Sequence, residues 1–159
     1  MTANHSFLFS DDFFLQHSDL LCESYERLLI GRSLRLGLAV AEAPARALFQ
    51  ASFALVSHGI EDDPVFNYAN RTALDLFEMT WEQFTALPSR HSAEPANREE
   101  RARLLARVSS HGYIDDYAGV RISSSGRRFL IEDAVVWNLI DDRGRYHGQA
   151  AVFDKWSYL

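Results

Sequence analysis

The last third of the sequence contains three long runs with the residue pattern of β-strands, and this feature restricts the fold most. The runs extend from Tyr113 to Ile122, from Arg127 to Ile140 and from Arg145 to Trp156. Four-residue turn sequences that end in glycine, 123–126 and 141–144, separate them. Because connections this short join neighbouring antiparallel strands, the sequence predicts a three-strand meander.

The middle strand has apolar side chains at both alternating positions. Alternation predicts one face with Phe129, Ile131, Val135, Trp137 and Leu139, and a second face with Leu130, Ala134, Val136 and Ile140. Either face left in water would form a large exposed apolar patch. We therefore expect core helices to cover one face, and an N-terminal helix or a second subunit to cover the other.

Upstream, a predicted strand turns directly into a helix. Pro64 ends an acidic turn, and the residues from Val65 to Ala69 suit a half-buried strand. Asn70 is placed to cap a helix whose apolar residues recur at helical spacing up to Phe77. A second short strand is predicted from Phe53 to His58. These two strands and the meander make five.

Further helices are predicted before and after this strand pair in the sequence. Capping-box sequences at 80–83 and 97–100 start two of them, and Gly112 ends the second. Before the strands, 11–30 is predicted as an amphipathic helix, 32–42 as a connector and 43–50 as a short helix. We therefore predict an α+β chain, with an N-terminal helical extension at 1–50 and the sheet domain at 51–159.

Composition excludes several classes of partner and location. The 159 residues are 47% hydrophobic, enough for a real core in one domain. A net charge of -6 argues against nucleic-acid binding. Cys22 is the only cysteine and cannot form an internal disulfide. With no signal peptide or membrane-spanning run in sight, we expect a cytoplasmic protein that does not bind membranes.

Several phrases of the sequence resemble the bacterial MEKHLA-type family of PAS-like domains. They are Ser57-His58-Gly59, 63–71, 87–95, 112–122, 126–129, Trp137-Asn138-Leu139 and 148–151. The resemblance implies a PAS-like fold, with a five-stranded antiparallel sheet and short helices on one face, and a sensory or ligand-binding role. The motif that names the family and the plant homeodomain are absent, so we expect a module without an intrinsic output domain.

The residues do not favour the cofactors of two kinds of PAS relative. Flavin-binding light sensors place a reactive cysteine in the stretch that here reads Ser89-Arg90-His91-Ser92. Haem-binding relatives use a histidine within the helix before the meander, where this chain has none until His111. The histidines also lack metal-ligand spacing. We therefore expect neither a covalent flavin photoadduct nor haem, predict no metal site, and leave the cofactor unknown.

Nine residues are candidates for ligand binding. Arg90 and Arg121 offer guanidinium groups that suit a carboxylate or phosphate, and Asn138 and Gln149 offer amides that suit a planar heterocycle. The full set is Tyr68, Asn70, Arg90, His91, Tyr117, Arg121, Trp137, Asn138 and Gln149. The alternative is structural: the amides satisfy the fold, and the arginines pair with acidic residues such as Asp115, Asp116, Glu132 and Asp133.

Three functions are compatible with these residues. The first is a sensory module that binds a small planar or anionic ligand, or a partner protein, and passes a conformational change to its N-terminal helices. We expect it to be a homodimer without catalytic residues. The second is a small enzyme in which His91 acts as general base and Arg90 or Arg121 stabilises an anion. The third is a pure dimerisation module.

Overall fold

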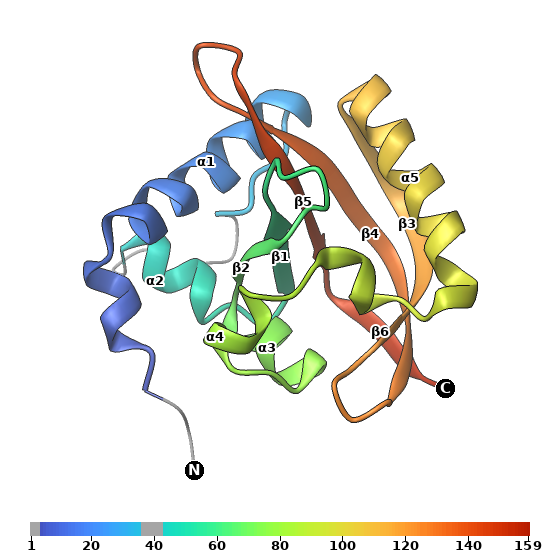
Figure 1. The fold of residues 1–159 in the computed structure, drawn as a ribbon. Helices are drawn as coiled ribbons and strands as arrows, with labels where there is room; N and C mark the ends of the chain where they lie inside the picture. The colour runs from blue at the N-terminus through green and yellow to red at the C-terminus, as the bar shows by residue number, and fades with distance from the viewer. Residues whose placement is uncertain (1–3, 36–42) are drawn as a thin grey trace.

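The computed structural model describes residues 4–35 and 43–159, so most of the predicted connector at 32–42 lies outside the described residues. Figure 1 shows an antiparallel sheet with helices on both sides. Its strands are β1 (Ala54–His58), β2 (Phe66–Ala69), β3 (Tyr113–Ile122), β4 (Arg128–Ile140), β5 (Tyr146–Phe153) and β6 (Lys155–Tyr158). The strand order is β2-β1-β5-β4-β3, and β6 pairs with β4. The predicted α+β sheet and meander are confirmed.

The last predicted strand is divided in two. β5 pairs with β4 from Val135 onwards, and β6 pairs with 129–132 of the same strand. Asp133 lies between the parts of β4 that pair with β6 and with β5. Its φ of 52° marks a local irregularity of the strand. One predicted strand is therefore two consecutive strands, β5 and β6.

The irregularity at Asp133 also changes which side chains share a face of β4. Ile131, Ala134 and Val136 line one cavity, although strict alternation would place Ile131 opposite the other two. Trp137 lies on the other face, against α1 (Asp12–Leu28). The prediction that Phe129 and Ile131 share a face with Trp137 is wrong, because the extra residue of the bulge reverses the alternation.

The N-terminal helix α1 covers the second face of the sheet. Its side chains Phe14, Leu21 and Tyr25 are buried. The indole Nε1 of Trp137 donates to Ser24 Oγ at 3.1 Å, and the indole lies 5.0 Å from the ring of Tyr25. A helix on this face was one of two expected covers, so the apolar pattern of β4 requires no second subunit.

The short helix α2 (Pro44–Phe49) joins the same apolar core as α1 and the sheet. The division of the chain into an extension at 1–50 and a domain at 51–159 stays a prediction. No helix in the described ranges is long and apolar enough to cross a membrane. The cytoplasmic location also stays a prediction.

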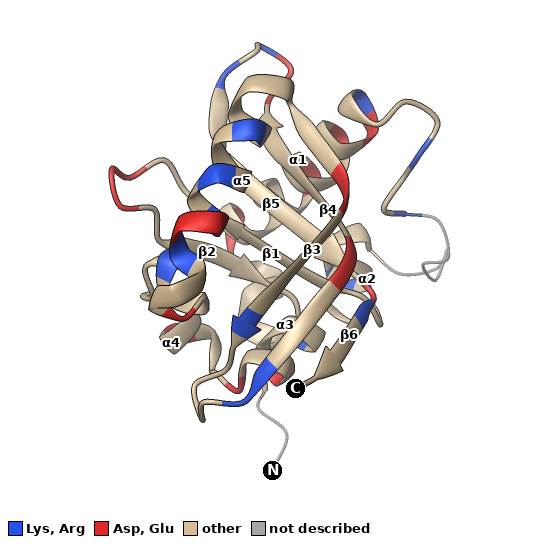
Figure 2. Cartoon of the chain, turned by 90° about the vertical axis from the view of Figure 1, so that its right-hand side faces the viewer, with Lys and Arg blue, Asp and Glu red and all other residues tan. Residues whose placement is uncertain are grey.

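The opposite face carries the remaining helices, which include α5 (Arg98–His111), α3 (Arg71–Phe77) and α4 (Trp81–Phe84). Short 3-10 turns at Ser89–Ser92 and Pro95–Asn97 lead into α5. Figures 1 and 2 place α5 and α1 on opposite sides of the strands. Figure 2 also shows basic and acidic positions interspersed along α5 and β3.

Two of the three predicted helix caps are confirmed. The Asn70 side chain accepts from Ala73 N at the start of α3, and Thr80 forms a capping box with Gln83 at the start of α4. Asn97 makes no side-chain cap bond. Its φ of -106° and ψ of -1° lie near helical values, because the preceding 3-10 turn runs directly into α5. The predicted capping box at Asn97 is therefore wrong.

Candidate functional site

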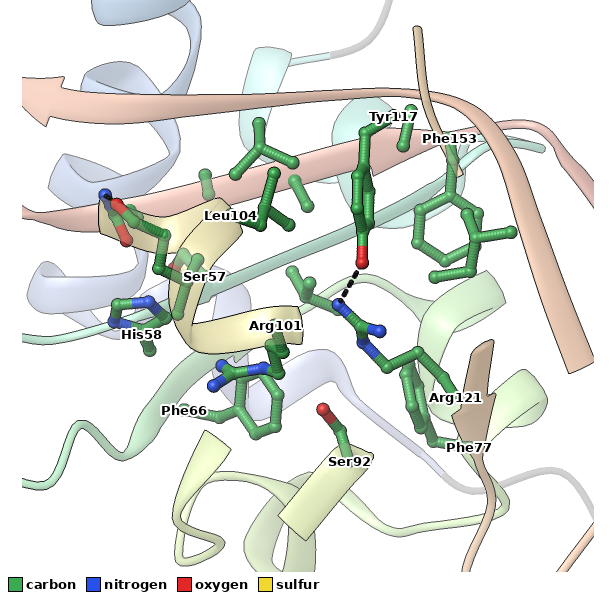
Figure 3. Close-up of a pocket in the computed structure, with 18 residues that line it drawn as sticks. Ser57, His58, Phe66, Phe77, Ser92, Arg101, Leu104, Tyr117, Arg121 and Phe153 are labelled. Atoms are coloured by element: carbon green, nitrogen blue, oxygen red, sulfur yellow. Dashed lines mark hydrogen bonds between the residues drawn. The ribbon is translucent and has the colours of Figure 1, made fainter. Parts of the chain in front are cut away.

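A small cavity lies between α5 and the sheet face that α1 does not cover. Its volume is about 60 Å³, above the roughly 10–15 Å³ that a single water requires. The wall combines apolar side chains with a few polar ones (Figure 3). It is formed by Val56, Ser57, His58, Phe66, Phe77, Ser92, Arg101, Leu104, Leu105, Tyr117, Arg121, Ile131, Ala134, Val136, Gln149, Ala150, Ala151 and Phe153.

Two buried arginines line this cavity from different elements. Arg101 of α5 is 8% exposed and Arg121 of β3 is 7% exposed. Arg101 Nη2 donates to Ser89 Oγ at 2.7 Å, while Arg121 donates to Val120 O at 2.8 Å and to Tyr117 Oη at 3.2 Å. Within 4–35 and 43–159, neither forms an ion pair with a carboxylate. Buried charges are normally paired, so this arrangement is unusual.

The two guanidinium groups make the cavity electropositive. Burial, together with the positive charge of Arg121, lowers the pKa of Arg101 to about 10. Arg101 is still charged near neutral pH, so its buried charge lowers the stability of the folded protein. An anion in the cavity would offset that cost.

Tyr117 lies flat across its own strand and forms part of the cavity wall. Its phenol accepts from Arg121 and donates to the carboxylate of Glu100 on α5 at 3.3 Å. Gly119 makes this position possible, because a Cβ there would lie 2.1 Å from the Tyr117 oxygen. The phenol thus links the buried Arg121 to the exposed Glu100.

His58 ends β1 and faces the same cavity. It is 6% exposed, and burial is the main cause that lowers its pKa, so the ring is neutral near pH 7. Its Nδ1 lies 3.0 Å from the carbonyl oxygen of Gly59. Its Nε2 is buried and has no hydrogen-bond partner in the described part of the chain. Buried polar atoms without partners are rare.

The two predicted amides hold α5 against the sheet. Asn138 Nδ2 donates to Val108 O at 3.0 Å. Gln149 Nε2 lies within 3.1–3.2 Å of three acceptors: Leu105 O, Ser109 Oγ and Asn138 Oδ1. Gln149 lines the cavity, and Asn138 supports it from behind. Their present contacts match the structural alternative.

The other five predicted residues lie away from the cavity. Tyr68 and Trp137 are buried on the face covered by α1, and Asn70 caps α3. Arg90 and His91 are exposed, and Arg90 forms an ion pair with Asp63 at 3.0 Å. The structure thus brings together Tyr117, Arg121 and Gln149, with Asn138 behind them. The arrangement in which His91 and Arg90 share the cavity is not present.

Sequence reasoning missed Arg101 and His58. A signal for Arg101 exists, because it stands three residues before Leu104 and seven before Val108, on the inward stripe of α5. A signal for His58 also exists, since it shares the alternation of Val56 in β1. In each case a polar residue occupies a position at which the periodicity of the element predicts a buried apolar side chain.

A family model described as the MEKHLA domain matches residues 15–158, which is most of the chain. The chain belongs to the MEKHLA domain family. It is 26% identical over 139 residues to the homeobox-leucine zipper protein HOX9 of Oryza sativa, covering 87% of this chain and 16% of that protein. It is 31% identical over 96 residues to ATHB-14 of Arabidopsis thaliana, covering 60% of this chain and 11% of that protein. This MEKHLA domain thus spans about one sixth or less of these relatives. They are plant proteins, so the bacterial assignment is not supported.

Solved structures show that this MEKHLA domain has a PAS-like fold. The PAS domain of a Colwellia psychrerythraea protein superposes with a TM-score of 0.58 at 15% identity, covering 72% of this chain and 92% of that one. A light-oxygen-voltage domain studied with a flavin analogue has the same TM-score and identity, covering 75% and 86%. The light-state dimer of the fungal photoreceptor Vivid has a TM-score of 0.55 at 12% identity, covering 82% and 90%.

The residues of this MEKHLA domain do not fit a flavin. The cavity of about 60 Å³ is far below the roughly 300 Å³ at which pockets for larger ligands begin. Cys22 is buried in α1 on the opposite side of the sheet, and burial raises the pKa of its thiol. Within the described ranges, no group of three or more His, Cys, Asp or Glu residues is placed to hold a metal ion.

The unpaired charge of Arg101 predicts a measurable cost to stability. Arg101→Met should raise the free energy of unfolding by about 1–3 kcal/mol without added anion, because it removes a buried cation and keeps most of the side-chain volume. Arg90→Met is the matched control, and loss of its exposed ion pair should cost at most about 1 kcal/mol. Urea unfolding measures both variants. A clear loss of stability in Arg101→Met would contradict this prediction.

Proposed function

We propose that this MEKHLA domain is a PAS-like sensory module that binds a small anion in the cavity between α5 and the sheet. One observation carries the proposal: Arg101 and Arg121 are both buried, both line the cavity, and neither pairs with a carboxylate in the described ranges. Guanidinium groups bind carboxylates and phosphates through charge-assisted hydrogen bonds. The ligand would supply the missing negative charge.

The size and lining of the cavity restrict the ligand. A volume of about 60 Å³ suits an anion of only a few non-hydrogen atoms unless α5 moves. The lining favours an anionic ligand over a planar heterocycle, because the Asn138 and Gln149 amides are already bonded to each other and to α5. We therefore place Arg101, Arg121, Tyr117 and His58 in contact with the ligand.

The sheet offers a route from the cavity to the N-terminal helix. Val136 faces the cavity, and its neighbour Trp137 packs against Ser24 and Tyr25 of α1. A ligand that shifts α5 or β4 would thereby change the surface on which α1 rests. A homodimer stays a prediction. Vivid, one of the structural neighbours, was crystallised as a dimer. Partner-protein binding and the expected lack of nucleic-acid binding also stay predictions.

Binding of small anions tests the proposal. Acetate, glycolate, phosphate and sulfate should be titrated against the wild-type protein at constant ionic strength, with the midpoint of thermal unfolding and the heat of binding as readouts. We expect at least one anion to bind and raise the midpoint, because a ligand that binds only the folded state stabilises it. Absence of binding by all four would contradict the proposal.

Arginine variants locate the anion. Arg101→Met and Arg121→Met should each weaken binding about 10- to 100-fold, since charge-assisted hydrogen bonds contribute about 1.5–3 kcal/mol. Arg90→Met, which removes an exposed arginine of the same type, should bind with wild-type affinity. Equal weakening in all three variants would indicate a general charge effect instead of this site.

A further inference from the structure

The hydrogen bonding of His58 determines which ring nitrogen carries the proton. Its Nδ1 lies 3.0 Å from the Gly59 carbonyl oxygen, which can only accept a hydrogen bond. Nδ1 must therefore be the donor. In a neutral imidazole the other nitrogen, Nε2, is then a bare acceptor.

No neighbouring side chain supplies a hydrogen to this acceptor. The Gln149 side chain lies close enough to His58 to oppose the lowering of its pKa. Its Nε2 amide, however, already lies within bonding distance of three other acceptors, and its remaining oxygen can only accept. The Ser92 hydroxyl donates to Ser89 O at 2.8 Å, and the Tyr117 phenol donates to Glu100. Within the described ranges, His58 Nε2 thus lines the cavity as a buried acceptor without a donor.

The cavity therefore presents two different requirements at once. Arg101 and Arg121 require negative charge, whereas His58 Nε2 requires a hydrogen-bond donor. Figure 3 shows the two guanidinium groups and the imidazole among the side chains that line the cavity. A fully deprotonated oxyanion such as sulfate would leave the imidazole unsatisfied and would place an oxygen lone pair against the nitrogen lone pair.

We propose that the ligand of this site is a small oxyanion that carries its own O–H group, such as hydrogen phosphate or a short hydroxycarboxylate. This inference rests on the proposed function and specifies its ligand class. The anionic oxygens accept from Arg101 and Arg121, and the hydroxyl donates to His58 Nε2. A site built around a buried polar group discriminates strongly against an analogue that leaves this group unpaired.

Two matched ligand pairs test this inference. Hydrogen phosphate is compared with sulfate, and glycolate with acetate, so that charge and shape change little while the O–H group is gained or lost. Calorimetry at pH 7.5 and constant ionic strength should give at least tenfold tighter binding for the hydroxyl-bearing member of one pair. Preference in the first pair identifies a phosphate-type ligand, and preference in the second identifies a hydroxycarboxylate.

The failure of this inference is distinguishable from that of the proposed function. Equal affinity within both pairs, with binding still lost in Arg101→Met, would overturn the inference and leave the anion site intact. No binding of any of the four anions would overturn both. Nitrogen-15 NMR of the imidazoles gives a test without ligand, in which His58 should be protonated at Nδ1. Protonation at Nε2 would also overturn the inference.

Variants of His58 distinguish the effect of its hydrogen-bond acceptor from the effect of its packing in the cavity wall. His58→Gln can place an amide oxygen near the position of Nε2 and should keep the preference for the hydroxyl-bearing anion. His58→Phe removes the acceptor and fills the same space with a ring. It should lose the preference within the pair while the affinity for the other member stays within about threefold. Loss of preference in both variants, with both folded by circular dichroism, would contradict the role of the acceptor.

Discussion

Replacing Asn70 with alanine is expected to destabilise the protein by about 3–5 kcal/mol, because it leaves several buried backbone groups unpaired. The Asn70 Oδ1 accepts from Leu55 N at 3.0 Å and from Ala73 N at 3.1 Å. Its Nδ2 donates to Leu48 O at 3.1 Å and to Phe53 O at 2.8 Å. One fully buried side chain therefore joins α2, β1 and α3. Urea unfolding followed by circular dichroism measures the loss.

Asn97→Ala is the matched control for this prediction. Asn97 stands at the start of α5 but makes no side-chain cap bond, so its removal should change the free energy of unfolding by less than about 0.5 kcal/mol. The backbone bond from Asn97 N to Glu94 O is kept in the variant. Similar losses in the two variants would contradict the stabilising role of the Asn70 side-chain hydrogen bonds.

Acidification is expected to destabilise the protein through His17, the second large effect. His17 is 5% exposed, and burial together with the charge of His147 lowers its pKa from 6.5 to about 4. The unfolded chain therefore binds a proton between pH 6.5 and 4 that the folded protein does not bind. Stability is complete above pH 6.5 and falls as the pH drops towards 4. The shift corresponds to a loss of about 3 kcal/mol.

The surroundings of His17 explain why the folded state excludes the proton. The ring is stacked on Phe13 at 5.1 Å and lies 5.9 Å from Tyr68, and its Nε2 contacts Ser57 Oγ at 2.8 Å. The stability of His17→Gln should fall less between pH 6.5 and 4 than that of the wild type, as measured by urea unfolding at each pH. His91→Gln replaces an exposed histidine and should follow the wild-type curve. Parallel curves for all three proteins would contradict the role of His17.

Most of the fold could be predicted because its signals are local. The turns at 123–126 and 141–144 define the meander, and the Asn70 and Thr80 caps mark the starts of helices. The bulge at Asp133 could not be predicted, because it requires a left-handed backbone at a residue without a sequence signature. Because β4 has apolar residues at both odd and even positions, a bulge that exchanges its two faces does not change the hydrophobic pattern of the sequence.

The candidate site was less accessible to prediction because it depends on contacts between distant segments. Arg90 was predicted to bind a ligand. In the structure it forms an ion pair at the surface with Asp63, which lies 27 residues upstream. Arg101 lies on the buried side of α5, three residues before Leu104, but an arginine in an arginine-rich helix gives no sign of burial by itself. Only the three-dimensional structure shows that Arg101 and Arg121 meet in one cavity without a carboxylate partner in the described ranges.

Under the proposed function, the two-sided packing of β4 is the element that would link the cavity to the N-terminal helix. Val136 and Trp137 are adjacent, one facing the cavity and the other facing α1, so a single peptide separates the two surfaces. Coupling between two binding events is reciprocal. Any factor by which an occupied cavity loosens or tightens the docking of α1 is also the factor by which the undocking of α1 changes the affinity of the cavity.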